Sequence, residues 1–260
     1  MAINTLNESN LHKKLKEIYA LQEGSRTEVE ADGKIYDVIT EDGTIVEIQT
    51  RNLSKLLPKV LKALENIRNI KIVYPVAREK IIKTLKADGT LISSRKSPKK
   101  ENLYSVFKEL TGLYPTLLLP GFTLEVLEVS ITEIRLQTEE NVQSKNKIRR
   151  FEKNWIKQDK LLNEIYGKYI FKTKEDYLAL LPETLVPKDC LANERKTKNR
   201  EENPDCQYFS RTDISNFLKQ NKETRQNAYQ NASLFIWVLE KMELIEYTGK
   251  EGRKKLYRVI

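Results

Sequence analysis

Residues 27–50, TEVEADGKIYDVITEDGTIVEIQT, contain three short runs of alternating polar and apolar residues, separated by Asp32-Gly33 and by Glu41-Asp42-Gly43. Alternation with a period of two is typical of strands whose two faces differ, and both separators are strong hairpin signals. The stretch therefore predicts three antiparallel strands, joined first by a two-residue turn and then by a three-residue loop.

Acidic side chains of the three predicted strands fall on one face. Counting from the turns places Glu28 opposite Asp37 and Asp37 opposite Glu47, with Gln49 on the same face. Like charges on directly paired residues repel, so the row needs a counter-ion. A hard divalent cation, a basic side chain from a neighbouring helix, or protonation of one acid would each supply it. Apolar residues share this face, namely Ile35, Ile39 and Ile45. A fully solvated face would not need them.

Helices and further strands are expected on both sides of this acidic hairpin. Leucine and isoleucine recur at helical spacing over 8–22, with Ser9 or Asn10 as the N-cap. A second helix is expected over about 52–66, before a buried strand at 70–76 (IKIVYPV). A long alternating strand is expected near 123–137.

The spacing Asp37, nine residues, then Glu47-Ile48-Gln49 resembles the Asp…Glu-x-Lys core of the PD-(D/E)XK nuclease superfamily, in a Glu-x-Gln variant. The order helix, acidic hairpin, helix and buried strand over residues 8–77 is similar to that core. The resemblance implies an α/β fold, with a restriction-endonuclease-like mixed sheet flanked by helices. It also implies a Mg²⁺-dependent endonuclease that hydrolyses DNA phosphodiester bonds, with Mn²⁺ able to substitute.

Carried over to this chain, the resemblance makes Asp37 and Glu47 ligands of Mg²⁺, with the backbone carbonyl of Ile48 as a further ligand. Gln49 stands where the superfamily has a Lys that positions or activates water. Because Gln has no positive charge, three alternatives are open. The metal alone lowers the pKa of water, another cation replaces the Lys, or catalysis has been lost.

The resemblance also calls for an additional acid, and the missing charge calls for a cation. The acid would be Glu28, by the pairing above, or Glu17 from the first helix. The cation would be Lys55 or Lys14.

Composition favours a nucleic-acid partner. The 260-residue chain has a formal net charge of +9, which suits phosphate backbones or anionic membranes. Apolar runs stay well short of the roughly 18 residues needed to span a bilayer, and the N-terminus MAINTLNESN resembles no export signal. We therefore expect a cytoplasmic protein that binds double-stranded DNA and no membrane.

Cysteine and histidine are scarce, because Cys190, Cys206 and His12 are the only ones. A structural zinc site needs about four such ligands, so zinc is excluded. A Cys/His nucleophile pair is also not expected, since His12 lies in a polar N-terminal helix far in sequence from both cysteines. The two cysteines are interpreted as reduced thiols.

Two basic segments are candidates for binding nucleic acid. The first is a cluster of cations with serine donors, formed by Arg95, Lys96, Ser97, Lys99 and Lys100. The second is a C-terminal winged helix, with a helix over 225–242 and a basic wing tip GKEGRKK. Its expected nucleic-acid contacts are Arg225, Gln226, Asn227, Gln230, Lys250, Arg253 and Lys254.

These interpretations together predict a two-domain protein. Residues 1–138 form the nuclease-like domain, 139–148 a linker, and 149–260 a mostly helical domain that begins with a helix carrying Trp155 and Leu161 and ends in the winged helix. Because cutting both strands usually needs two active sites, a homodimer is also expected. Two other functions remain open: a non-catalytic DNA-binding regulator on a degenerate nuclease core, and a structure-specific or RNA-directed nuclease.

Overall fold

The computed structural model describes residues 8–31, 33–144, 147, 150–186, 208–220 and 225–260, with the side chains of all of these except 225 and 226. Cys190 and Cys206 lie outside the described residues. The chain divides into two compact units. The first comprises Met1–Arg51, Ile70–Leu103 and Glu125–Tyr169, and the second Asn52–Asn69, Tyr104–Leu124 and Ile170–Ile260.

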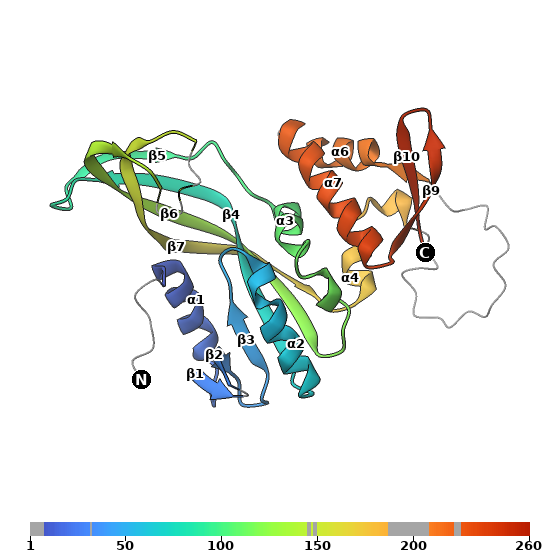
Figure 1. Cartoon of the computed structure of the whole chain (residues 1–260), viewed down its shortest axis with the longest axis horizontal. Helices are drawn as coiled ribbons and strands as arrows, with labels where there is room; N and C mark the ends of the chain where they lie inside the picture. Colours follow the sequence, from blue (N-terminus) through green and yellow to red (C-terminus); the bar gives the residue numbers. More distant parts are fainter. Residues whose placement is uncertain (1–7, 32, 145–146, 148–149, 187–207, 221–224) are drawn as a thin grey trace. The chain divides into compact units, whose positions relative to one another are not determined.

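The first unit is built on a mixed seven-stranded sheet in which β3 and β4 run parallel (Figure 1). Its strand order is β1-β2-β3-β4-β6-β7, and β5 pairs with β4. The strands are β1 (Arg26–Ala31), β2 (Lys34–Ile39), β3 (Ile45–Ile48), β4 (Ile70–Leu85), β5 (Leu91–Lys96), β6 (Phe122–Val142) and β7 (Lys153–Phe171). The general α/β class with a mixed sheet and flanking helices is therefore confirmed.

The register of the β1–β2–β3 hairpins is the one that their turns predict. Ala31 pairs with Lys34, and Gly33 has a φ of 69°. At the second turn, the amide of Thr40 donates to the carbonyl of Thr44 at 3.0 Å, and Gly43 has a φ of 79°. Glycine has no Cβ and adopts this left-handed backbone at little cost. Both turns therefore set the register without strain.

Helix α1 (Asn10–Ala20) covers one face of this sheet. It begins as expected at Ser9, whose hydroxyl accepts from the amide of His12 at 3.3 Å. Leu11 and Leu15 are almost fully buried, and they pack in one cluster with valines and isoleucines of the central strands, including Val38 and Ile48. Burying the apolar stripe of α1 fixes the rotation of the helix, so its other side chains reach the edge of β2 and β3.

One predicted element is wrong. The segment with Trp155 and Leu161 is not a helix, because Lys153–Phe171 forms β7 at the edge of the sheet. The side-chain amide of Asn163 on β7 donates to the hydroxyl of Ser130 on β6 at 3.2 Å. Residues 139–148, expected to link two domains, therefore lie inside the first unit.

The second unit is mainly helical. Phe235 of α7 is fully buried, and its ring centroid lies 4.7 Å from that of Phe107 on α3 and 5.4 Å from that of Tyr104. The longer helices are α2 (Leu57–Glu65), α6 (Arg211–Gln220) and α7 (Arg225–Lys241). The shorter pieces are η2 (Leu53–Leu56), η3 (Leu103–Val106), α3 (Phe107–Leu110), η4 (Tyr114–Thr116), α4 (Lys174–Leu178) and η5 (Glu183–Leu185).

The C-terminal elements follow the expected order of helix, helix and hairpin. A three-stranded sheet of order β8-β10-β9 flanks α6 and α7. Its strands are β8 (Phe209–Ser210), β9 (Ile245–Glu251) and β10 (Lys254–Val259). Asp213 caps the start of α6 as predicted, since its Oδ2 accepts from the amide of Ser210 at 2.7 Å. Within the described residues, the structure contains no helix with the length and apolarity that crossing a membrane requires.

Candidate functional site

Asp37 and Glu47 meet where β2 and β3 diverge. The two strands pair only at Val38–Val46 and Ile39–Ile45. Beyond this short ladder, Glu47 Oε1 accepts from the amide of Asp37 at 3.0 Å, and Asp37 Oδ2 accepts from the amide of Ile48 at 2.9 Å. Each carboxylate thus satisfies a backbone amide at the fork, which holds both groups in place. Glu47 is 3% exposed, so its carboxyl group is held in a largely dry setting.

His12 of α1 reaches the same fork. Its Nε2 lies 2.7 Å from the carbonyl oxygen of Ile48 and 3.3 Å from Asp37 Oδ2, while its Nδ1 contacts Glu8. Both ring nitrogens therefore face acceptor oxygens, an arrangement that suits the doubly protonated imidazolium. Burial alone would lower the pKa of His12, but Asp37, Glu8 and the Ile48 carbonyl outweigh it and raise that pKa above its ordinary value.

Lys16 supplies a second cation from α1. Its Nζ lies 3.0 Å from Glu8 Oε1 and 3.0 Å from Glu28 Oε1. Burial would lower the pKa of Lys16, but its hydrogen bonds to Glu8 and Glu28 raise it. His12 and Lys16 are four apart, so they lie on one side of α1, and Glu8 directly precedes the N-cap Ser9. Asp37 and Glu28, two of the three acids of the row, thus contact basic side chains from a neighbouring helix, which is the second of the predicted means.

Glu28 lies opposite Asp37 in register, as expected. The pairs Thr27–Val38 and Val29–Tyr36 flank these two residues. Glu28 itself has a φ of 52°, a left-handed conformation that is uncommon for a residue with a side chain. Its carboxylate is bound to Lys16, and no described contact joins it to Asp37 or Glu47 directly.

The other expected catalytic residues are placed differently. Gln49 follows β3 and is half-buried, and its backbone amide donates to the carbonyl of Val73 at 2.9 Å. Lys55 is exposed on η2, in the second unit. Lys14 and Glu17 form an exposed pair with each other at 3.2 Å. The missing positive charge is therefore not supplied by Lys14, because its ammonium group is paired away from the fork.

The donor atoms at the fork have the chemistry that Mg²⁺ prefers. Two carboxylates and a backbone carbonyl are hard oxygen ligands. Yet within the described part of the chain, no three or more carboxylate, imidazole or thiol groups stand together as a metal site. His12 Nε2 instead lies beside two of the three expected ligands, Asp37 and the Ile48 carbonyl. These residues fit a divalent cation once the imidazolium has lost its proton.

The basic cluster of the sequence lies on a β-hairpin arm. β5 pairs antiparallel with β4, with Arg95 opposite Ile82 and Lys96 opposite Ile81. Arg95, Lys96, Lys99 and Lys100 are exposed. Ser97 differs from these cations, because it is 8% exposed and its hydroxyl accepts from the backbone amide of Lys99 at 3.2 Å. It therefore stabilises the turn after β5.

At the C-terminus, the expected contacts divide into three groups. The side chains of Arg225 and Gln226 lie outside the described residues. Asn227 and Gln230 are exposed on the first turns of α7, whereas the next residue, Asn231, is 9% exposed and belongs to the core side. The wing residues are exposed at the β9–β10 turn, namely Lys250, Arg253 and Lys254.

Sequence reasoning missed the role of α1 at this site. The signal was present, because Glu8, His12 and Lys16 recur every four residues beside the buried Leu11 and Leu15. A helix that buries these leucines against the sheet must present that polar line along the border of the contact. The histidine was discounted as a zinc or nucleophile partner, and its distance in sequence from Asp37 concealed the contact.

Comparison with known proteins places the chain in a family. The model described as "Domain of unknown function (DUF8091)" matches residues 9–172, and the chain belongs to this family. It is 35% identical over 187 residues to an uncharacterized protein of Treponema pallidum (strain Nichols), a match that covers 70% of this chain and 71% of the relative. No solved structure matches the chain significantly. The matched residues contain α1 and all seven strands of the large sheet.

Proposed function

We propose that this member of the DUF8091 family is a Mg²⁺-dependent endonuclease that hydrolyses DNA phosphodiester bonds, with a restriction-endonuclease-like core. The observation that carries the proposal is the pair of hydrogen bonds at the fork of β2 and β3, in which Glu47 Oε1 accepts from the backbone amide of Asp37 and Asp37 Oδ2 accepts from the backbone amide of Ile48. It fixes two acids and the Ile48 carbonyl at the end of a short strand that runs parallel to β4. The acids were chosen from the sequence on the spacing of the PD-(D/E)XK motif, and the fold supports that choice.

The metal would be held by Asp37, Glu47 and the Ile48 carbonyl. Glu28, on the neighbouring strand, would influence the site through its ion pair with Lys16. Bound Mg²⁺ would supply Lewis-acid activation of water and stabilise negative charge on the phosphate. The protein contributes orientation, because the backbone amides of Asp37 and Ile48 restrain the two carboxylates. Mn²⁺ would substitute, since it prefers the same oxygen ligands.

His12 takes a role that Gln49 cannot fill. A neutral imidazole can accept a proton from water, whereas an amide cannot act as a base near neutral pH. Contacts with Asp37, Glu8 and the Ile48 carbonyl outweigh burial and raise the pKa of His12, so binding of a divalent cation beside it would favour the neutral imidazole. The proposed site is therefore expected to be more active where His12 is neutral.

DNA binding would use both basic surfaces. The exposed cations of the β4–β5 arm are suited to phosphate contacts, which add affinity without reading sequence. The order β8-β10-β9 around α6 and α7 supports a winged helix, with Asn227 and Gln230 toward bases and the wing cations toward phosphate. Beyond its first turns, α7 is packed into the core, so only its N-terminal end is available for a groove. Cutting of both strands would require a homodimer.

A nuclease assay tests the proposal. Supercoiled plasmid is incubated with the full chain and Mg²⁺ or Mn²⁺, beside Asp37→Asn, Glu47→Gln and the matched control Glu30→Gln, an exposed acid on β1. We expect metal-dependent cutting that falls by at least about 100-fold in the first two variants, because each loses a metal ligand. The control should cut normally. Equal cutting by all four proteins, or no cutting with any metal, would contradict the proposal.

A second function is favoured by one observation. Basic side chains of α1 already contact Asp37 and Glu28, and Gln49 stands where the superfamily has a Lys. A non-catalytic DNA-binding regulator on a degenerate core would have this arrangement. This alternative predicts DNA binding without cutting, and a DNA affinity that Asp37→Asn leaves unchanged.

An RNA substrate, incubated in parallel with the DNA, separates a nuclease directed at RNA from one directed at DNA.

A further inference from the structure

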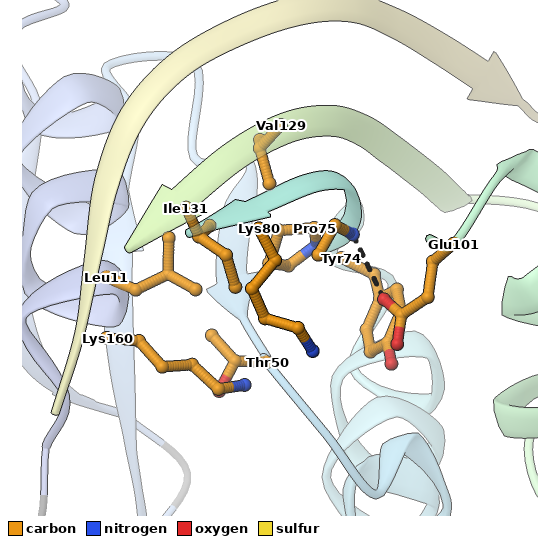
Figure 2. A pocket seen from close by; sticks show the side chains of 10 residues that line it. Leu11, Thr50, Tyr74, Pro75, Lys80, Glu101, Val129, Ile131 and Lys160 are labelled. Carbon is orange, nitrogen blue, oxygen red and sulfur yellow. Dashed lines mark hydrogen bonds between the residues drawn. The ribbon is translucent and has the colours of Figure 1, made fainter. Parts of the chain in front are cut away.

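A cavity of about 60 Å³ opens in the first unit and contains the ends of two lysines. Figure 2 shows Lys80 of β4 and Lys160 of β7 extending toward the same space, with Thr50 between their ends. Apolar side chains of Leu11, Val129 and Ile131 form one side of it. The cavity is therefore lined by two cations and a hydroxyl against an apolar wall.

Lys160 is held in an unfavourable setting. Burial lowers the pKa of its ammonium group, and the charges of Lys157 and Lys80 lower it further against the opposing effects of Glu101 and Glu133. Among the described residues, neither Lys80 nor Lys160 forms an ion pair. A buried ammonium group without a paired anion is costly, because desolvation is not offset. An anion in the cavity would supply the missing negative partner of this ammonium group.

Glu101 also borders the cavity, but it is engaged elsewhere. Its Oε2 accepts from the amide of Ala77 at 3.0 Å, as the dashed line in Figure 2 shows. Two lysines and one glutamate leave a net positive charge around the space. The cavity therefore favours anions over cations.

The size of the cavity limits the anion. A water needs roughly 10–15 Å³ measured in this way, so the space holds on the order of four waters. Four oxygens are what a phosphate monoester presents. An internal phosphodiester needs room for the chain on both sides, whereas a terminal phosphate needs it on one side only. Lys and Thr are donors that commonly bind phosphate oxygens.

The cavity adjoins the candidate site along the chain. Leu11 precedes His12, and Thr50 follows Gln49, so both walls are direct neighbours of site residues. The cavity and the fork therefore draw on neighbouring residues of α1 and of the segment after β3.

We infer that this cavity binds the terminal phosphate of a nucleic-acid strand, with Lys80 and Lys160 as its cationic partners and Thr50 as a hydroxyl donor. The inference rests on the proposed function for its substrate class, and it adds that the protein recognises strand ends. A terminal phosphate would position the strand so that the bond attacked lies at a fixed spacing from the end.

A binding measurement without catalysis tests the inference. Oligonucleotides of one sequence, labelled internally, carry a 5′-phosphate, a 3′-phosphate or hydroxyls at both ends. Their affinities for the full chain are measured by fluorescence anisotropy in EDTA, so that no metal-dependent cleavage occurs. We expect one phosphorylated end to bind about tenfold or more tighter than the hydroxyl form, the usual effect of charge-assisted hydrogen bonds. Equal affinity of all three would overturn the inference.

Variants assign the preference to the cavity. Lys160→Met and Lys80→Met should bring the affinity ratio of phosphate to hydroxyl ends close to one. The matched control Lys86→Met removes an exposed cation after β4, so it should weaken all three oligonucleotides alike and keep the ratio. Thermal melting of each variant verifies folding, and Thr50→Val, which removes only a hydroxyl, should lower the ratio in part. A ratio unchanged in both lysine variants would place the phosphate elsewhere.

The two proposals fail separately. An end preference without cutting in any metal removes the nuclease and keeps the phosphate cavity. Metal-dependent cutting without an end preference keeps the nuclease and removes the cavity from substrate binding.

Discussion

The imidazole Nε2 of His12 lies 2.7 Å from the carbonyl oxygen of Ile48, the backbone atom expected to contact a metal ion. The same nitrogen lies 3.3 Å from Asp37 Oδ2. Helix α1 thus places an imidazole nitrogen beside two of the oxygen ligands of the proposed site. A proton on that nitrogen and a metal ion would compete for the same groups, and this competition would give the proposed site a pH dependence.

The pKa of His12 should be measurably raised. It is the only histidine in the chain, so a single set of imidazole signals in an NMR titration reports it. Asp37→Asn should lower this pKa, because Asp37 is the largest of the influences that raise it. Since the folded pKa exceeds the unfolded one, the stabilisation that His12 contributes is fully present below the unfolded pKa. It is lost as the pH rises through the folded pKa. A titration at or below the ordinary histidine pKa would contradict the contact.

Metal affinity should rise with pH until His12 is neutral. Displacing one proton changes the apparent affinity by at most about tenfold per pH unit. Mn²⁺ binding, followed by electron paramagnetic resonance between pH 6 and pH 8.5, measures this slope. His12→Ala should flatten it, while His12→Lys, a permanent cation, should abolish binding at every pH. A slope unchanged in His12→Ala would show that the metal does not compete with this proton.

The acidic hairpin was predictable because its turns allow few solutions. Gly33 and Gly43 both adopt positive φ, which fixes turn length and therefore pairs Asp37 with the end of β3. Local chemistry alone determines this register. The contact of His12 with the fork is different, because it depends on how α1 rotates when Leu11 and Leu15 are buried, and no local signal reports that rotation.

β7 was misread for a related reason. Its apolar residues do not alternate strictly, because the strand lies at the edge of the sheet and both of its faces are partly exposed. Lys160 lines the cavity and Leu162, two residues later on the same face, packs against the apolar cluster of α1 and the central strands, so polar and apolar positions mix on one side. Periodicity loses its meaning where neither face is uniformly buried. The phosphate cavity was consequently out of reach of sequence reasoning.

Lys160→Met should stabilise the protein, and more so at lower pH. The folded pKa of Lys160 is lowered, so the unfolded chain binds the proton more tightly. The cost of charging this lysine is therefore fully present below the folded pKa and disappears as the pH rises above the unfolded one. Urea unfolding at pH 7 and at pH 10 compares the variant with Lys86→Met, whose exposed side chain should give no such difference. A destabilised Lys160→Met at pH 7 would mean that the ammonium group has a bound partner.

Salt dependence should locate the β4–β5 arm on the nucleic acid. Each phosphate contact that is removed lowers the slope of log affinity against log salt by about one unit. Neutralising Lys96 and Lys99 to Gln should therefore flatten the slope by about one to two units, since both side chains are exposed on the arm. Lys62→Gln is the matched control, because this half-exposed cation lies on α2 and pairs with Glu65 at 3.7 Å. An unchanged slope in the arm variant would remove β5 from the interface.

Phe235→Ala should unfold the second unit preferentially. The ring is fully buried between Tyr104 and Phe107, and truncation of a buried Phe typically costs about 3–5 kcal/mol. The chain has two tryptophans, Trp155 in the first unit and Trp237 in the second, so Trp155→Phe leaves one fluorescent reporter beside α3. Denaturant unfolding followed through Trp237 should shift strongly, while Tyr229→Ala, which truncates a 51% exposed ring on the same helix, should shift little. If Trp155, observed in a Trp237→Phe background, shifts as far as Trp237 does, the two units unfold as one cooperative body. The nuclease-like core would then depend on the C-terminal helices for its stability.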